Sequence, residues 1–177
     1  MNNKGFTLIE LIVVIAMMSV IVGSSISLFG SVSNQKIKNF TSTFDDMVSQ
    51  CKVETASGTP KTALELQVTN GEYRAVIYKN YGETNQTVIK DVFLGKDSLI
   101  CEVNSYAFDF QATGDNAIVF YFDRTTGEMT VDASCITGYV VPNEYKSKTE
   151  IAVCQYENQI KHKVQIINRT GYHKIVR

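Results

Sequence analysis

An apolar run from Phe6 to Gly30 constrains this chain more than any other feature, because it contains a single ionisable side chain, Glu10. An α-helix rises about 1.5 Å per residue and the hydrocarbon core of a bilayer is about 30 Å thick, so about 20 apolar residues can cross it. We therefore predict a membrane-spanning helix here. The only preceding charge is Lys4, and the positive-inside tendency then places the N-terminus in the cytoplasm and the remaining chain across the membrane.

Two other interpretations of this run are a secretory signal peptide and a plain membrane anchor. Gly23-Ser24-Ser25 could serve as a signal-peptide cleavage site, although the apolar region of a signal peptide usually has about 7–15 residues. Neither interpretation explains Glu10. Insertion scales give a cost of about 2.5–3.5 kcal/mol for Asp, Lys or Arg at the middle of a membrane helix, and a Glu near one end costs less but still needs a reason. We therefore treat this acid as a functional residue.

Lys4 and the sequence Gly5-Phe6-Thr7-Leu8-Ile9-Glu10, followed by the long apolar helix, resemble the processing site of type IV prepilins and type II secretion pseudopilins. The resemblance implies that a prepilin peptidase cuts between Gly5 and Phe6 and methylates the new amine of Phe6. It also implies a cytoplasmic-membrane precursor that becomes part of an extracellular pilus or pseudopilus. The membrane-helix positions that we single out are Phe6, Leu8, Leu11, Ile12, Val13, Val14 and Ile15.

The resemblance gives Glu10 a role in subunit assembly. In this family the carboxylate of an incoming subunit is thought to pair with the terminal amine of its neighbour, and opposite charges attract strongly in a low-dielectric environment. The implied partners are other pilin subunits, the prepilin peptidase, the pilus assembly platform and the membrane. The implied function is that of a structural subunit rather than an enzyme. The alternative is a membrane-anchored extracellular binding module or enzyme that uses its N-terminus only as an anchor.

The helix is expected to continue into solvent as an amphipathic segment over residues 31–58. Apolar or small residues recur at every seventh position, with two more between them, and charged residues fall off this stripe. Gly58-Thr59-Pro60 is expected to end the helix, since Gly is favoured just past a C-terminus and Pro cannot continue it. The stripe consists of Gly30, Ile37, Phe40, Phe44, Met47 and Cys51, and the charged residues beside it are Lys36, Lys38, Asp45, Asp46 and Lys52.

From residue 62 onward the apolar pattern has period two and predicts β-strands. Asn70-Gly71 predicts a type I′ hairpin, because both central residues of that turn need positive φ. Turns are expected at residues 123–127 and at Thr170-Gly171. The predicted strands are 62–69, 72–80, 87–94 ended by Gly95, 99–103, 106–112, 117–122, 128–131, 151–156, 164–168 and 173–176.

Composition argues against several classes of function. The chain has 17 Lys and Arg against 18 Asp and Glu, so no bulk attraction to nucleic acid or anionic lipid follows. Nucleophile-elbow, P-loop, zinc-protease and dinucleotide-binding motifs are absent from the sequence, and we expect no catalytic residue, cofactor or metal. His162 and His173 are expected at a solvated surface, although DNA binding by this basic C-terminal end, with help from Tyr139, Tyr145 and Tyr156, is a weaker alternative.

Four cysteines, Cys51, Cys101, Cys135 and Cys154, allow three disulfide connectivities on an oxidising exterior, and spacing selects none of them. Free buried cysteines, which behave as small apolar residues, are equally compatible with the sequence.

These patterns together predict an α+β protein whose long N-terminal helix packs on a largely antiparallel sheet, as in pilins. The expected domains are a leader at 1–5, a transmembrane half-helix at 6–30, an amphipathic half-helix at 31–58 and an extracellular β-rich domain at 59–177. Residues 118–123 with Gly127, and 164–168 with Gly171 and Ile175, resemble the C-terminal domain of GspH/FimT-like minor pilins. Major pilins commonly carry a proline in the N-terminal helix, and its absence before Gly58 also favours a minor pilin or pseudopilin.

Overall fold

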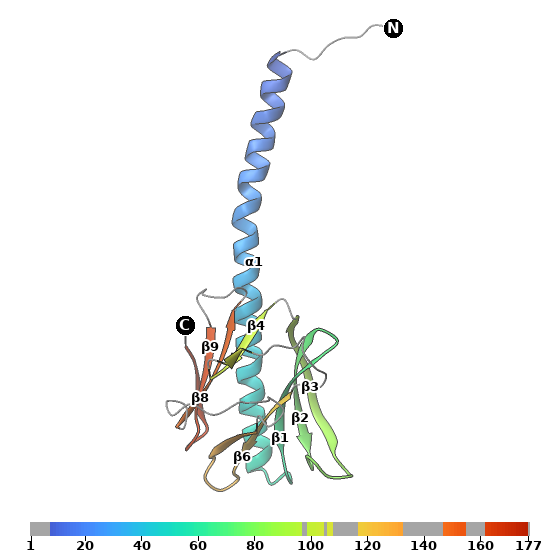
Figure 1. Ribbon diagram of the computed structural model, residues 1–177, viewed down its shortest axis with the longest axis vertical. Coiled ribbons are helices and arrows are strands. Elements are labelled where there is room, and N and C mark those ends of the chain that lie inside the picture. The colour runs from blue at the N-terminus through green and yellow to red at the C-terminus, as the bar shows by residue number, and fades with distance from the viewer. Residues whose placement is uncertain are drawn as a thin grey trace. The chain divides into compact units, whose positions relative to one another are not determined.

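The computed structural model describes residues 8–96, 99–104, 106–107, 117–132, 147–154 and 162–176, with the side chains of 21–33 and 106–107 left undescribed. The chain divides into two compact units, residues 1–36 and residues 37–177. Helix α1 (Leu8–Ala56) contributes to both units (Figure 1).

In the second unit, α1 buries one stripe of its surface. Ile37, Phe40, Phe44, Met47 and Cys51 are each at most 3% exposed, whereas the charged residues beside them are exposed or half-buried. The predicted amphipathic pattern is therefore confirmed for these positions. The apolar face drives the helix onto the sheets, since a stripe of this width cannot be left in water without cost.

Helix α1 ends in a Schellman motif. The N–H of Thr59 donates to the carbonyl of Glu54, and the N–H of Gly58 donates to the carbonyl of Thr55. Gly58 has φ of +92°, a conformation that glycine adopts at no steric cost. The sequence signal at Gly58-Thr59-Pro60 is thus realised as a defined stop, with Ala56 as the last helical residue.

The first sheet has the strand order β3-β2-β1-β6-β7, and all of its pairs are antiparallel. Its strands are β1 (Ala63–Thr69), β2 (Glu72–Lys79), β3 (Thr87–Lys96), β6 (Ala117–Phe122) and β7 (Met129–Asp132). Asn70 and Gly71 connect β1 to β2 with φ of +53° and +74°, which confirms the hairpin predicted from this dipeptide.

Strand β3 does not end at Gly95, as the sequence pattern predicted, but continues to Lys96. Gly95 pairs with Tyr73 beside a register shift, so the glycine lies within the strand. A Cβ at this position would lie 2.9 Å from Leu99 Cδ1 and 3.3 Å from Phe40 Cδ2. The glycine therefore serves close packing at an irregular point of the strand rather than a turn.

The second sheet has the order β10-β9-β8-β4-β5 and is also antiparallel throughout its described pairs. Its strands are β4 (Ile100–Val103), β5 (Tyr106–Ala107), β8 (Lys148–Cys154), β9 (His162–Ile167) and β10 (Tyr172–Val176). The strand predicted over 106–112 is described only at 106–107. The two sheets meet where the N–H of Met129 donates to the carbonyl of Asn168 at 2.6 Å.

Residues of α1 and of both sheets (Figure 1) form one buried cluster. Phe40 meets Tyr73 edge-on at 5.4 Å between ring centroids, and Phe44 meets Phe120 at 5.8 Å. Residues of the second sheet in the same cluster include Val103, Ile151, Val153, Val164 and Ile166.

The expected α+β class and antiparallel pairing are confirmed, but the expectation of a single sheet was wrong. The described strands form two five-stranded sheets, because the strand after β3 starts a new set of pairs with β8 instead of extending the first sheet. The pilin-like arrangement as a whole stays a prediction.

Cys51 and Cys101 are buried and free. Burial raises the pKa of the Cys51 thiol to about 12 and also raises the pKa of the Cys101 thiol, so both stay protonated and pack as small apolar residues. Cys154 is also buried, and Cys135 lies outside the described residues.

Candidate functional site

The first candidate site is the apolar surface of α1 in residues 8–20. Successive residues of a helix are rotated by about 100°, so large apolar side chains at ten of these thirteen positions cover its whole circumference. They are 44–76% exposed: Leu8, Ile9, Leu11, Ile12, Val13, Val14, Ile15, Met17, Met18 and Val20. A helix that is apolar on every side is normally buried by something else, and such a surface marks contact with a membrane or with other protein.

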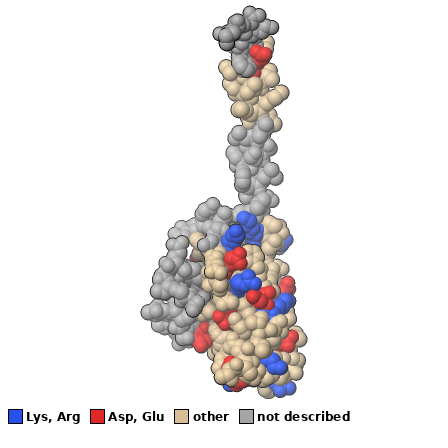
Figure 2. Space-filling model, turned by 90° about the vertical axis from the view of Figure 1, so that its right-hand side faces the viewer, with Lys and Arg blue, Asp and Glu red and all other residues tan. Residues whose placement is uncertain are grey.

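Polar groups in this stretch are few. Figure 2 shows its described atoms as uncharged apart from acidic atoms near its start. Glu10 lies in the first turn of α1, where the helix dipole favours a negative charge, and its side chain is exposed. The Ser19 hydroxyl donates to the carbonyl of Ile15 at 2.8 Å, which satisfies this polar group within the helix itself.

The predicted cleavage and methylation residues, Gly5 and Phe6, lie outside the described residues, so the pairing of Glu10 with an amine stays a prediction. Leu8, Leu11, Ile12, Val13, Val14 and Ile15 all lie on α1. Among the residues that the structure describes, no helix has an apolar stretch long enough to cross a membrane.

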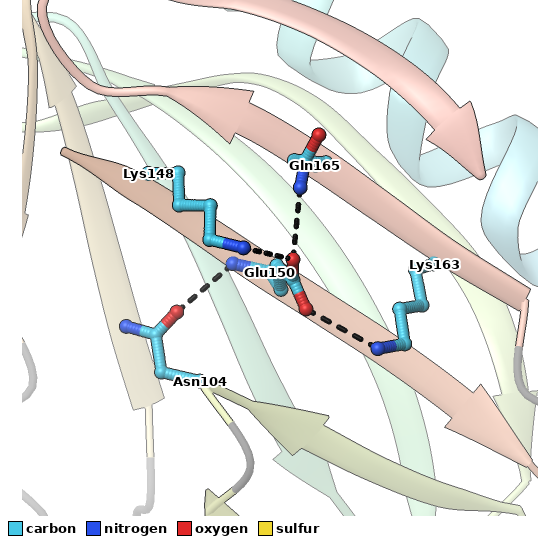
Figure 3. Close-up of polar contacts among 5 residues, drawn as sticks. All are labelled: Asn104, Lys148, Glu150, Lys163 and Gln165. Atoms are coloured by element: carbon cyan, nitrogen blue, oxygen red, sulfur yellow. Dashed lines mark hydrogen bonds and ion pairs between the residues drawn. The ribbon is translucent and has the colours of Figure 1, made fainter. Parts of the chain in front are cut away.

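The second candidate site is a polar cluster around Glu150 on β8, which sequence analysis missed (Figure 3). Its carboxylate accepts from Lys148 Nζ at 2.9 Å, Gln165 Nε2 at 2.8 Å and Lys163 Nζ at 3.2 Å. Asn104 brackets the same residue, accepting from the Glu150 N–H and donating its own N–H to the Glu150 carbonyl. These partners are 2 to 46 residues away in sequence, and no local motif signals them.

Burial alone would raise the pKa of Glu150, but the hydrogen bonds from Lys148, Gln165 and Lys163 outweigh it and lower the pKa to about 2. The carboxylate therefore stays ionised and fully bonded at neutral pH, which makes it a poor general acid or base. We interpret the cluster as structural, because its hydrogen bonds connect β8 to β9 and to Asn104 at the end of β4.

His173 does not lie at a solvated surface, contrary to the sequence-based expectation. Its side chain is 16% exposed, and its Nε2 lies 2.8 Å from Ser49 Oγ and 3.8 Å from Asp45 Oδ1 on α1. His173 lies on β10 two residues after Gly171, whose carbonyl accepts a hydrogen bond from Lys52 Nζ on α1 at 2.7 Å. A Ser, a His and an Asp meet here, but both oxygens lie at the same ring nitrogen, which is not the relay that activates a nucleophile.

The Asp45 carboxylate beside this histidine is partly buried, which is unfavourable for its charged form. Burial raises the pKa of its carboxyl, the charge of His173 opposes that change, and Asp46 adds to it. Its Oδ1 is buried and has no hydrogen-bond partner among the described residues. The contact between β10 and α1 therefore leaves one buried carboxylate oxygen of Asp45 without a hydrogen bond.

Other predicted residues fall outside a common site. Tyr139, Tyr145 and Tyr156 are not described, Lys163 is engaged by Glu150, and His162 is half-buried on β9. The part of the chain that the structure describes contains no group of three metal-ligating side chains.

Comparison with known proteins identifies one segment. Residues 1–26 match the family model described as the prokaryotic N-terminal methylation motif, which is the class III signal peptide of type IV pilins and pseudopilins. Comparisons with curated proteins and with solved structures gave no significant match.

Proposed function

We propose, from the methylation motif at residues 1–26, that this chain is the precursor of a structural subunit of a type IV pilus or a type II secretion-like filament. A prepilin peptidase cuts it between Gly5 and Phe6 and methylates the Phe6 amine. The single observation that carries this function is the coincidence of that motif with a helix that is apolar on every described side of residues 8–20.

The exposed apolar surface of residues 8–20 explains how one segment can serve two states. Before assembly, lipid covers it and holds the precursor in the cytoplasmic membrane. After assembly, the helices of neighbouring subunits cover the same side chains in the filament core. Both surroundings are apolar, so the helix is shielded from water in the membrane as well as in the assembled filament. An assembly platform performs the extraction.

Glu10 sets the register in this proposal. A carboxylate surrounded by apolar side chains is costly unless an opposite charge meets it, and cleavage at Gly5 creates such a charge on Phe6. Within one subunit these two residues are about one turn apart. Pairing of Glu10 with the amine of a neighbouring subunit would fix the axial position of each new copy, and the β domain at residues 59–177 would form the filament surface outside the membrane.

The finer proposal is a minor pilin or pseudopilin. No proline occurs between Phe6 and Gly58, and α1 is continuous from Leu8 to Ala56 without the helix-disturbing residue common in major pilins. The GspH/FimT-like resemblance of residues 118–123 and 164–168 supports the same subgroup. Residues 118–122 lie in β6 and residues 164–167 lie in β9.

The test uses two substitutions in the producing cell. Gly5→Leu should leave the leader attached and prevent polymer formation, whereas Thr7→Ser, two positions away, should be processed normally. Glu10→Ala should be cleaved and kept in the membrane but lost from sheared filaments, whereas Glu10→Asp keeps the charge and should assemble in part. Normal incorporation of Glu10→Ala would overturn the pairing, and normal function of an uncleaved Gly5→Leu chain would overturn the subunit role.

A further inference from the structure

We propose that Asn85 is an N-glycosylation site, at which a membrane transferase outside the cytoplasm attaches an oligosaccharide from a polyprenyl-diphosphate donor. The inference rests on the proposed function only in placing residues 59–177 outside the membrane. Two features of the described residues carry it. The motif at Asn85 is the one of three acceptor motifs that the fold leaves open, and it adjoins an exposed edge of the first sheet.

The sequence contains the acceptor motif Asn-x-Ser/Thr, with x other than Pro, at three places. The three motifs begin at Asn39, Asn85 and Asn168. Glu83 lies two positions before Asn85, whereas an isoleucine stands at that position before each of the other two. A carboxylate two residues before the acceptor gives a bacterial transferase of this class a charged group to bind, so the sequence favours the motif at Asn85.

The loop between β2 and β3 presents the Asn85 motif to solvent. Every residue from 82 to 88 is exposed. The backbone carbonyl of Asn85 accepts from Asn80 Nδ2 at 3.4 Å, but its side-chain amide has no hydrogen-bond partner among the described residues. The Gln86 side chain instead closes the loop, since its Oε1 accepts from the N–H of Gly82 at 2.8 Å. The amide nitrogen of Asn85 is therefore accessible to an enzyme while the loop keeps its shape.

The fold closes the other two motifs. Thr41, the hydroxyl residue of the Asn39 motif, is 1% exposed and donates to the carbonyl of Ile37 at 2.7 Å within α1. Asn168 is half-buried, and its Oδ1 accepts from Thr149 Oγ1 at 2.9 Å. A transferase that reads this motif must reach the amide and the hydroxyl together, so the folded chain offers neither of these two sites.

Glu83 is also accessible. It pairs with Lys61, but the side chains of Glu83 and Lys61 are 38% and 64% exposed. A pair as exposed as this contributes little to stability, because solvent screens it. The Glu83 carboxylate can therefore exchange Lys61 for a basic group of the enzyme at small cost.

The motif adjoins an open edge of the first sheet. Thr87, the hydroxyl residue of the motif, is the first residue of β3, which pairs with β2 and lies at the end of the described strand order. Val88 and Phe93 on this strand are 56% and 48% exposed. A long edge strand with exposed apolar side chains is prone to pair with another chain unless something covers it. A bulky, hydrated glycan two residues before the strand supplies such a cover.

The reaction is a glycosyl transfer without a change of oxidation state. The Nδ2 atom of Asn85 forms a bond to the anomeric carbon of the oligosaccharide, and the bond from that carbon to the diphosphate oxygen breaks. The polyprenyl diphosphate leaves with the bonding electrons, and a base of the transferase accepts the amide proton. The Thr87 hydroxyl is a positioning group, because it binds the enzyme and does not react.

The test measures the mass of the peptide of residues 80–90, which cleavage after Lys79 and Lys90 releases from the full-length chain purified from the producing cell. The mass should exceed that of the unmodified peptide by the sum of several sugar residues. Fragmentation should locate these sugars on Asn85, and the peptides that contain Asn39 and Asn168 should be unmodified.

Four substitutions at exposed positions of this loop and strand separate the motif from its surroundings. Thr87→Ala should lose the added mass, whereas Thr87→Ser should keep it, because the hydroxyl is retained. Glu83→Gln should lower the modified fraction, because it removes the charge that the transferase binds. Thr84→Ala changes a residue that the motif does not specify, and as the matched control it should leave the modified fraction unchanged.

An unmodified 80–90 peptide would overturn the inference, as would sugars on Thr84 or Thr87, sugars on either of the other two motifs, or an equal loss in Thr87→Ser and Thr87→Ala. The N-terminal peptide is analysed in the same samples. A methylated Phe6 together with an unmodified Asn85 overturns the glycosylation site alone, whereas an intact leader overturns the proposed function whatever the state of Asn85.

Discussion

Glu150→Gln is the substitution whose effect follows most directly from the structure. Three side-chain donors within 3.2 Å lower the pKa of this carboxyl to about 2, against 4.5 for an ordinary glutamate. At about 1.4 kcal/mol per pKa unit, that separation corresponds to about 3 kcal/mol. Lys148 and Lys163 are 38% and 39% exposed, so solvent screens part of their attraction. We therefore expect the free energy of unfolding to fall by about 2 kcal/mol.

The effect should depend on pH in a defined direction. Because the pKa of Glu150 is lower in the folded chain, its stabilisation is complete above about pH 4.5 and is lost as the pH falls toward about 2. Urea unfolding of the full-length chain in mild detergent, followed by circular dichroism of the β domain, measures it. The difference between wild type and Glu150→Gln should shrink toward zero in acid.

The exposed Glu128→Gln is the control for Glu150→Gln and should change the free energy of unfolding by less than about 0.5 kcal/mol. An equal loss of stability at pH 7 and pH 2.5, or no loss at pH 7, would refute the assignment of the effect to the carboxylate charge.

Three further predictions concern α1 and the first hairpin. Asp45→Asn removes a half-buried charge whose Oδ1 has no hydrogen-bond partner among the described residues, so at pH 8 it should raise the free energy of unfolding by about 1 kcal/mol. This gain should shrink in acid as the raised pKa of Asp45 is crossed, and a loss of stability at pH 8 would contradict it. Phe44→Ala leaves a cavity at a fully buried site and should lower the free energy of unfolding in urea by about 3–5 kcal/mol. Val53→Ala, at a position 66% exposed on the same helix, should lower it by less than about 0.5 kcal/mol. Similar losses for both variants would contradict the packing. Gly71→Ala forces a side chain into positive φ and should lower the thermal unfolding midpoint through a cost of about 1–2 kcal/mol, so an unchanged midpoint would count against the turn assignment.

The sequence predicted the elements whose signals are local. The stripe of Ile37, Phe40 and Phe44 needs only the helical period, and Asn70-Gly71 needs only the φ preference of two residues. Gly58 stopped the helix for the same kind of reason. In each case the residues that determine the structure lie within about two turns of helix or one hairpin of each other.

The features that the sequence did not predict depend on contacts between distant residues. Ser49 and His173 are 124 residues apart, and nothing near either one signals the other. Glu150 on β8 bonds with two residues of β9 and with Asn104, which follows β4, and the pairing order of these strands is not encoded in any one of them. The division into two sheets has the same origin, because β4 could pair with β3 or β8 on its own pattern, and the packing of both sheets on α1 decides between them.

The most direct measurement of the central claim is the mass of the N-terminal peptide of the mature protein, isolated from the surface filaments or membranes of the producing cell. The account predicts a peptide that begins at Phe6 and carries one methyl group on its amine. A peptide that begins at Met1, or one that begins near Ser25, would show that the chain uses its apolar helix only as an anchor or a signal, and it would contradict the account.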